Sequence, residues 1–444
     1  MSKIPTSKLV PFRIHTIVAA GVVIFLCSLP LMAESSARIV RLSDVHGTVE
    51  IDKNGGAGFE NAFVNLPVTQ GSKVRTGNNG RAEIEFEDGS SIRLAPDTTV
   101  EFSKLSLSDS GTRISQVNLV EGMAYCNLLG KDDFSLAFSH ENLTLQHAAH
   151  FRVDASNEVA NLAVFKGEVE VEGPAGKMTV EKKKTATFNV ADEDKYTVEN
   201  KIVEAPLDAW DKESIAYHDQ YAKNNSSPYG YGTADLNYYG AYTNVPGYGL
   251  MWQPYFAGVG WDPFLDGAWG FYPGFGYMFA SAYPWGWLPY RYGNWMFVPG
   301  FGWMWQPGMW GGWVTVPRFA TTRFVHVTPL VAPTTGVKTV LVGRAATSRT
   351  FSVRTVNEGS AGMGIPRGSM RNLGHLNQQV VKNGSVQVRP TPQFAGTSPS
   401  RMSGGGYAQP HGNSQPHTSM GGAPPMGHAS SSMGHASGGG TPHK

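Results

Sequence analysis

Cysteine is almost absent from this chain, and its scarcity excludes a fold built on disulfide bonds. The 444 residues include two cysteines, and one of them, Cys27, lies in an apolar run close to the N-terminus. If that run is removed after export, Cys126 has no cysteine to pair with inside the chain. Cys126 lies in a strand-like stretch without a nearby pattern of His or Asn, so we expect a small buried apolar residue rather than a nucleophile.

Long apolar runs are also scarce. The most apolar stretch, residues 17–29, is short for a membrane-spanning helix and typical of a secretory leader. Basic residues precede it and small residues follow it: Lys3, Lys8 and Arg13, then Ala33 and Ala37. This order predicts that residues 1–37 are a signal peptide and that the protein is exported, to the periplasm, the outer envelope or the extracellular space. The alternative is an uncleaved leader that anchors the chain in the membrane.

Acidic residues are scarce in the second part of the chain. Residues 38–266 contain 20 Lys and Arg against 33 Asp and Glu, whereas residues 267–444 contain 13 Lys and Arg and one acidic residue, Glu358. Two parts of opposite charge can attract each other or serve different partners. The simpler interpretation is a solvated acidic domain followed by a basic tail. We expect no nucleic-acid partner.

Recognisable catalytic constellations are missing. No Ser-His-Asp, Cys-His or phosphate-binding loop can be assembled with suitable spacing. The carboxylates before residue 203 alternate with apolar residues, as on the solvated face of a strand. Glu168, Glu170 and Glu172 share one side, where Lys177 or the lysines at 182–184 can balance their charge. We therefore predict that the protein is not an enzyme and uses no cofactor, with a glycan hydrolase that uses these carboxylates as the enzymatic alternative.

What the chain does contain is a long series of strand patterns. Residues 38–203 show alternating apolar and polar side chains, for example at 45–51, 82–86 and 164–171. Alternation with a period of two places one face of a strand on a core and the other in water. Turn signals recur about every ten residues, which suits a sandwich, a barrel or a β-solenoid and leaves no room for helical crossovers.

Several motifs in this stretch resemble the FecR domain. They are Gly71-Ser-Lys-Val-Arg-Thr-Gly77, Gly80-Arg-Ala-Glu-Ile-Glu-Phe-Glu-Asp-Gly-Ser90, Ile92-Arg-Leu-Ala-Pro-Asp-Thr-Thr-Val100 and Leu119-Val-Glu-Gly122, with Ala148-Ala-His-Phe-Arg-Val153 and Gly167-Glu-Val169 in place of the family's closing signature. The resemblance implies a β-solenoid-like extracytoplasmic module. In the regulators that name the family, this module relays a signal to a sigma factor. We do not carry that role over, because no cytoplasmic helical domain precedes the leader.

One helix is expected after this domain. Leu207, Trp210 and Tyr217 recur near helical spacing, and acidic residues lie near the expected start, where the helix dipole favours anions. This pattern predicts a linking helix within residues 204–224.

Aromatic residues are concentrated in residues 225–316. Within this segment, residues 229–313 hold 10 of the 11 Trp and 12 of the 17 Tyr, with Gly and Pro throughout. A step of eight residues between aromatics predicts short strands joined by turns. The motifs at 247–254, 284–295 and 299–305 resemble an uncharacterised Trp/Tyr-rich domain that follows FecR domains in exported bacterial proteins.

These rings can be the core of a small domain or a binding surface. We expect too many for all to be buried, so that several are displayed in one row and bind a ligand by stacking. The predicted row consists of Trp261, Trp269, Trp285, Trp295 and Trp303. The predicted ligand is a neutral polysaccharide of the cell envelope or of the extracellular space.

The remaining residues lose order by composition. Residues 317–358 keep some apolar alternation and are predicted to be a partly ordered basic segment. Residues 359–444 contain no Asp or Glu and are rich in Gly, Ser, Pro, Met and His. Such a segment buries too little apolar area to offset the entropy of ordering, so we predict a disordered low-complexity tail.

Two sets of histidines are candidate metal ligands. The first is His140, His147 and His150, which Asp154 could complete, although positions 147 and 150 face opposite sides of a strand. The second set lies in the tail, where imidazole and nearby Met suit weak capture of copper: His411, His417, His428, His435 and His443. Ordinary surface and linker histidines are the simpler interpretation, so no metal site is predicted.

Together these patterns predict an all-β protein: a FecR-like β-solenoid or β-sandwich module, one linking helix, a small aromatic Gly/Pro-rich β-repeat domain and a disordered C-terminal tail. The predicted function is that of an exported, non-catalytic binding or scaffold protein of the cell envelope that contacts polysaccharide. The first alternative is an envelope signalling module of FecR type with a protein partner. The second is a weak glycan-acting enzyme.

Overall fold

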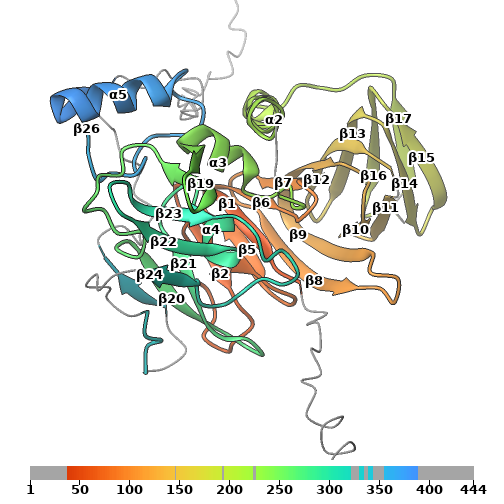
Figure 1. Ribbon diagram of the computed structural model, residues 1–444. Helices are drawn as coiled ribbons and strands as arrows, with labels where there is room; N and C mark the ends of the chain where they lie inside the picture. Colours follow the sequence, from red (N-terminus) through yellow and green to blue (C-terminus); the bar gives the residue numbers. More distant parts are fainter. Residues whose placement is uncertain are drawn as a thin grey trace, which may run out of the picture. The chain divides into compact units, whose positions relative to one another are not determined.

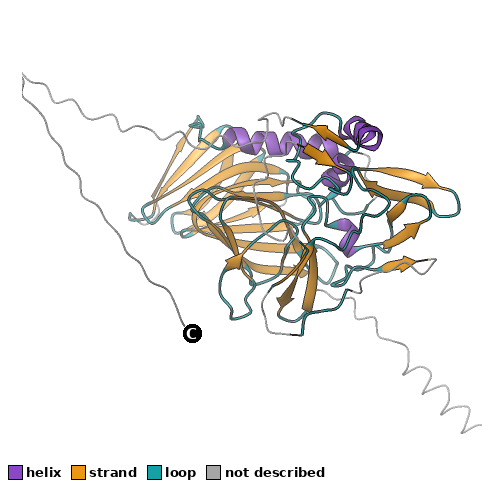
Figure 2. Cartoon of the chain, turned by 90° about the vertical axis from the view of Figure 1, so that its left-hand side faces the viewer, coloured by secondary structure: helices purple, strands orange, loops and turns teal. Residues whose placement is uncertain are grey.

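Strands are the most frequent element of the described chain, and helices are few (Figure 2). The computed structural model describes residues 38–145, 147–192, 195–223, 227–321, 330–334, 339–343 and 355–388 (Figure 1). The predicted signal peptide and the tail histidines lie outside these residues. Within these ranges, no helix is long and apolar enough to cross a membrane.

Residues 38–199 form two sheets that share one long strand, β9 (Arg113–Leu128). Sheet A contains, in spatial order, β4 (Pro67–Val68), β1 (Val40–His46), β6 (Arg81–Glu85), β7 (Ser91–Leu94), the second half of β9, β12 (Ala149–Ala155), β13 (Val159–Lys166), β16 (Lys184–Asn189) and β17 (Lys195–Glu199). Sheet B contains β3 (Glu60–Asn61), β2 (Val49–Asp52), β5 (Lys73–Thr76), β8 (Thr99–Leu107), the first half of β9, β10 (Asp133–Phe138), β11 (Glu141–Leu145), β14 (Glu168–Gly173) and β15 (Gly176–Glu181). The prediction of an all-β fold is confirmed.

Strand β9 changes sheets at Gly122. The residues before it pair with β8 and β10, and those after it pair with β7 and β12. Gly122 has a φ of +90°, and a Cβ at this position would lie 2.5 Å from the carbonyl oxygen of Asp97. Glycine is therefore required here for both its left-handed backbone and its close approach to the turn between β7 and β8.

The apolar side chains of both sheets face each other and form one core. Fully buried examples are Leu42, Ile84, Ile92 and Phe151 from sheet A, and Val74, Val100, Leu136 and Leu143 from sheet B. Burying one such side chain stabilises a fold by about 1.5–3 kcal/mol, so this core accounts for a stable domain without disulfides. Cys126 belongs to the same core, as predicted, and burial raises the pKa of its thiol.

The predicted linking helix is present as α2 (Asp208–Tyr221). It is not the sole helix of the described chain: α3 (Thr233–Tyr239), α4 (Leu288–Arg291) and α5 (Leu373–Asn383) also form. The first two of these are a turn or two long, and such short segments carry too little periodicity to be recognised in a sequence.

The aromatic segment folds into hairpins, as predicted. One sheet has the order β18 (Gly240–Val245), β19 (Gly249–Pro254), β23 (Gly302–Gln306), β22 (Asn294–Val298) and β24 (Phe319–Thr321). A second sheet pairs β21 (Gly276–Ser281) and β25 (Val340–Val342) with β20 (Gly267–Tyr272). Trp295 and Trp303, which are eight residues apart, lie on the two strands of the β22–β23 hairpin. Trp295 lies opposite Trp305 in register, and Trp303 lies opposite Phe297.

The prediction that order ends at residue 359 is wrong for residues 359–388, which form an ordered unit with residues 355–358. Residues 355–388 are here called the C-terminal segment. It forms β26 (Thr355–Asn357), α5 and β27 (Ser385–Gln387). The side chain of Asn372 accepts a hydrogen bond from the backbone of His375 at the start of α5, and Gly384 ends the helix with a φ of +75°. Six buried apolar side chains of the segment pack into the aromatic core: Val356, Ala361, Ile365, Leu373, Val380 and Val388. This burial supplies the apolar contacts that its composition does not reveal.

Candidate functional site: a buried ionic network on sheet A

The five tryptophans predicted as a ligand-binding row lie in a core. Their exposed fractions are 4% for Trp261, 3% for Trp269, 0% for Trp285, 0% for Trp295 and 3% for Trp303. The expectation that these rings are displayed along one surface is therefore wrong. Trp261, Trp285 and Trp295 surround one another, with ring centroids 5.8–5.9 Å apart. Their faces, which a sugar would need for stacking, are occupied by other rings.

The N–H groups of two of these indoles are also paired. Trp261 donates a hydrogen bond to the Tyr283 hydroxyl at 3.0 Å. Trp285 donates to the carbonyl oxygen of Ala361 at 2.7 Å, which ties the aromatic core to the C-terminal segment. Buried Trp side chains commonly find such a partner, so these bonds indicate a structural role for the rings.

The three candidate metal ligands of the β domain are not brought together. His140 and His147 are exposed, whereas His150 stacks on Phe165 at 4.7 Å and its Nε2 lies 2.7 Å from a carboxylate oxygen of Asp211. Over the ranges that the structure describes, no group of three or more His, Cys, Asp or Glu is placed to hold a metal ion.

The structure instead gathers charged side chains on the outer face of sheet A. Arg41 and Arg93 are fully buried there, and Glu83 and Glu85 are each 1% exposed. The interpretation of the alternating carboxylates as a solvated face is therefore wrong at these two positions. It is correct at Glu168, Glu170 and Glu172, which are exposed, and Lys177 pairs with Glu170 at 2.9 Å.

Helix α2 covers this face, and its charged side chains form ion pairs with those of the sheet. Asp208 pairs with Arg152 on β12, and Asp211 pairs with Arg93 on β7 at 2.9 Å. About two turns after Asp211, His218 lies between the two carboxylates of β6. Its Nε2 is 3.0 Å from Glu83, and its Nδ1 is 3.3 Å from Glu85.

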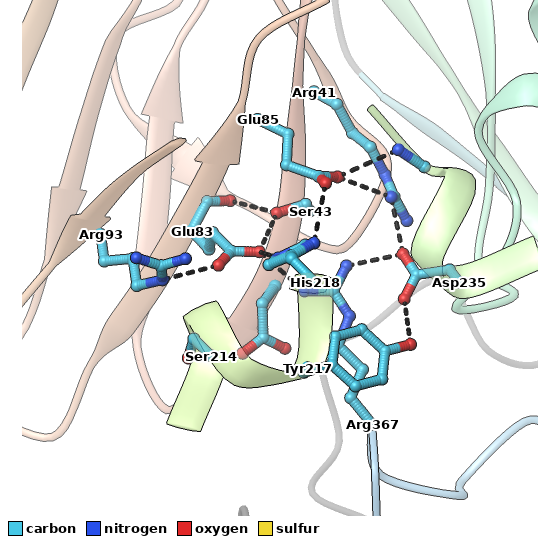
Figure 3. A network of polar contacts seen from close by, with 12 residues as sticks. Arg41, Ser43, Glu83, Glu85, Arg93, Ser214, Tyr217, His218, Asp235 and Arg367 are labelled. Carbon is cyan, nitrogen blue, oxygen red and sulfur yellow. Dashed lines mark hydrogen bonds and ion pairs between the residues drawn. The ribbon is translucent and has the colours of Figure 1, made fainter. Parts of the chain in front are cut away.

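Helix α3 and the C-terminal segment complete the network (Figure 3). Asp235 on α3 receives Arg41 at 2.6 Å and Arg367 at 2.7 Å, and its other oxygen accepts a hydrogen bond from Tyr217. Arg367 also reaches Glu83 at 2.8 Å. An arginine of the basic part of the chain thus binds carboxylates of the acidic part, as mutual attraction of the two parts requires.

The charges of this network balance when His218 is protonated. Arg41, Arg93 and Arg367 then face Glu83, Glu85, Asp211 and Asp235, with His218 as the fourth cation and His150 beside Asp211. Removing charges from water costs several kcal/mol for each ion, which is offset only when partners are close and well oriented. The distances of 2.6–3.3 Å between the charged atoms of the network meet that condition.

The pKa values of the network follow from this competition between burial and charge. Burial opposes ionisation of Glu83, but His218 and Arg93 outweigh it and hold the pKa of Glu83 well below its usual range. Burial likewise opposes ionisation of Asp235, yet Arg367 and Arg41 lower its pKa. Burial disfavours protonated His218, but Glu83 and Glu85 raise its pKa. The surrounding charges therefore favour the ionised forms of Glu83 and Asp235 and the protonated form of His218.

Further polar contacts join the sandwich directly to the aromatic segment. Arg41 donates to the carbonyl oxygen of Pro284 at 2.8 Å, and the Asn65 amide donates to the carbonyl oxygens of Ser281 and Tyr283 at 3.0 and 2.6 Å. The backbone of Gly230 donates to the carbonyl oxygen of Glu87 at 2.7 Å. These bonds satisfy buried groups from both parts of the chain, so the site holds the two parts together.

Comparison with known families agrees with this division of the chain. Residues 72–170 match the model of the family described as FecR protein, and residues 233–333 match a family of unknown function, DUF6600. The chain is thus a β protein with a FecR domain. Its second module is a DUF6600 domain, which contains all strands of the two aromatic sheets except β25. A comparison with curated protein sequences finds no match.

Two solved structures resemble part of the chain. Both are crystal structures of a protein from Parabacteroides distasonis ATCC 8503 assigned as an anti-sigma factor, at 2.50 and 1.65 Å resolution. The first is 19% identical over 33% of this chain and 71% of its own, with a TM-score of 0.27. The second is 18% identical over 35% of this chain and 76% of its own, also with a TM-score of 0.27.

Proposed function

We propose that this protein is an exported module of FecR type in the cell envelope, that it acts through contacts with another protein, and that it catalyses no reaction. The FecR match over residues 72–170 supports this proposal, because the family is one of extracytoplasmic protein modules. The observation that carries it furthest is the difference between the two outer faces of the sandwich. On sheet A, the outer face of β1, β6, β7 and β12 is covered by α2, α3 and the C-terminal segment, whereas sheet B has an open outer face.

The open face of sheet B is continuous and polar. One row of cross-strand partners runs across it from β5 to β15: Lys73, Glu101, Asn118, Ala137, Asn142, Glu172 and Lys177. Next to this row lie Gln116, Thr144 and Glu170, which are all exposed. A broad sheet face of this kind suits docking of a folded protein better than capture of a small molecule.

The charge of this face indicates the charge of its partner. Acidic side chains outnumber basic ones on it: Glu50, Asp52, Glu101, Glu121, Asp133, Glu168, Glu170, Glu172 and Glu181 against Lys73, Arg75, Lys104 and Lys177. Complementary potentials steer association and set specificity, so the partner surface is expected to be basic and the complex to weaken as salt is added.

Polysaccharide binding by the tryptophan row receives no support, because the rings lie in the core. The role of the aromatic module in this proposal is structural. It holds α3 and the C-terminal segment on sheet A and leaves sheet B to the partner.

The test is photo-crosslinking in cells of the source organism. A photoreactive amino acid replaces Gln116, Thr144 or Glu170 on sheet B, and Thr243 on β18 is the matched exposed control. We expect adducts to a discrete protein from the three sheet B positions, sensitive to protease and reduced by the second substitution Glu168→Lys. Adducts that are removed by glycosidase, or adducts of equal yield from Thr243, would contradict the proposal.

A further inference from the structure

Sheet A ends at an edge strand, β17, whose outer side pairs with no other strand that the structure describes. Its last strand, β17, pairs in antiparallel register with β16, which is its one strand neighbour in the ranges that the structure describes. All five residues of β17 are exposed (Figure 1 shows the strand at the outer edge of the sandwich). An exposed edge strand presents unpaired backbone N–H and C=O groups that can pair with another strand.

The inner side of this edge is apolar and incompletely covered. Val198 and Tyr196 lie opposite Ala186 and Phe188 of β16, which are buried in the core. On β17 itself, the same side of the sheet is left 41% exposed at Tyr196 and 42% exposed at Val198. The core between the sheets therefore extends to this edge without being closed there.

The sequence of β17 is complementary to itself. If a second copy runs antiparallel with Thr197 opposite Thr197, Lys195 of each strand faces Glu199 of the other, and Tyr196 faces Val198. Opposite charges and aromatic–β-branched pairs are favourable across antiparallel strands, and like charges are unfavourable. An edge protected against pairing carries charges that repel a copy of itself, whereas these charges attract one.

We infer that β17 is a self-association surface: two copies of this chain pair through antiparallel β17 strands about a two-fold axis at Thr197. Sheet A then continues from one copy into the other, and each copy covers the exposed Tyr196 and Val198 side chains of its partner. A two-fold contact of this kind closes on itself and gives a dimer rather than a fibre. The paired edge lies in sheet A, so the outer face of sheet B is left for another protein.

The decisive experiment uses charge reversal with the otherwise unchanged chain. Lys195→Glu alone, or Glu199→Lys alone, places like charges opposite each other at both ends of the strand pair. We expect each to weaken dimerisation by roughly tenfold or more in a concentration series followed by sedimentation velocity. The double variant, and an equimolar mixture of the two single variants, restore opposite charges and should restore the dimer. Lys182→Glu is the control, since it makes the same change of charge at an exposed turn.

A second measurement locates the axis. Two strands with Thr197 opposite Thr197 have Cα atoms about 4.5–5.5 Å apart there, within reach of a disulfide. Thr197→Cys should form a covalent dimer on mild oxidation, whereas Lys182→Cys and the unsubstituted chain should not. A monomer at every concentration, a dimer that both charge reversals leave unchanged, or equal crosslinking at positions 197 and 182 would each overturn the proposal. If the β17 edge is occupied but Thr197→Cys forms no covalent dimer, another segment of the chain pairs with β17. That result also contradicts self-pairing.

Discussion

Arg367 and His218 both contact the same carboxylate oxygen, Oε1 of Glu83. Arg367 Nη1 lies 2.8 Å and His218 Nε2 lies 3.0 Å from Oε1 of Glu83, a carboxylate that is almost fully buried. The Ser43 hydroxyl donates to the same oxygen at 2.7 Å. A residue of the C-terminal segment and a residue of helix α2 thus share one anion on β6, so the attachment of both elements depends on its charge.

The pH dependence of stability should report on His218. Its pKa is raised in the folded protein, because Glu83 and Glu85 favour the proton more strongly than burial opposes it. A raised folded pKa gives a contribution that is complete below the unfolded value of about 6.5 and is lost as pH rises through the folded pKa. We expect the free energy of unfolding, measured with denaturant, to fall on the alkaline side of pH 6.5. His218→Gln should remove this decline, and the exposed His147→Gln should keep it. Equal slopes in both variants would assign the decline to another group.

Removal of Arg367 should be strongly destabilising. Arg367→Met leaves Glu83 and Asp235 buried with one cation fewer, and breaking a buried ion pair from one side costs about 3–5 kcal/mol. Limited proteolysis should then cut within residues 355–388 before it cuts the sandwich. The exposed Arg371→Met is the control and should behave as the unsubstituted chain. An unchanged unfolding free energy for Arg367→Met would mean that the network contributes little to holding the segment.

Truncation of Trp285 distinguishes a core from a binding row. Trp285 is fully buried, stacks on Tyr283 at 5.1 Å and contacts the rings of Trp252, Trp261 and Trp295. Trp285→Ala should lower the free energy of unfolding by about 3–5 kcal/mol, as large-to-small changes in a core do. Phe301→Ala, at a ring that is 43% exposed, should change it by less than about 0.5 kcal/mol. If Trp285→Ala is as stable as the unsubstituted chain and loses glycan binding, the result would support an exposed, glycan-binding row of tryptophans and contradict the core role.

Substitution of two glycines with nearly the same φ distinguishes the cost of a left-handed backbone from the cost of a steric clash. Gly122 has a φ of +90° and Gly111 a φ of +83°, but a Cβ would strike the Asp97 carbonyl oxygen only at Gly122 and would meet nothing within 4 Å at Gly111. Gly111→Ala should cost about 1–2 kcal/mol, from the left-handed backbone alone. Gly122→Ala should cost clearly more in denaturant unfolding, because β9 must also shift where it changes sheets. Equal costs would show that β9 bends without needing this contact.

Much of the fold is determined locally and was predictable. Alternation at 82–86 and 164–171, the helical spacing of Leu207, Trp210 and Tyr217, and the FecR motifs predict the strands, α2 and the domain order that the structure shows. These patterns depend on neighbouring residues, so a single sequence contains them.

Which faces are buried was decided only by the tertiary structure. A strand pattern such as Ala82-Glu-Ile-Glu-Phe86 indicates two faces, but not whether an element from residues 208–221 or 367 covers the polar one. The same applies to Trp261, Trp285 and Trp295, which come from separate segments and meet in one core. Burial is a sum over contacts between residues distant in the chain, and periodicity measures only local order. The sequence by itself determined the strands and the charges of this protein, and long-range packing decided that Glu83, Arg367 and the tryptophans hold it together.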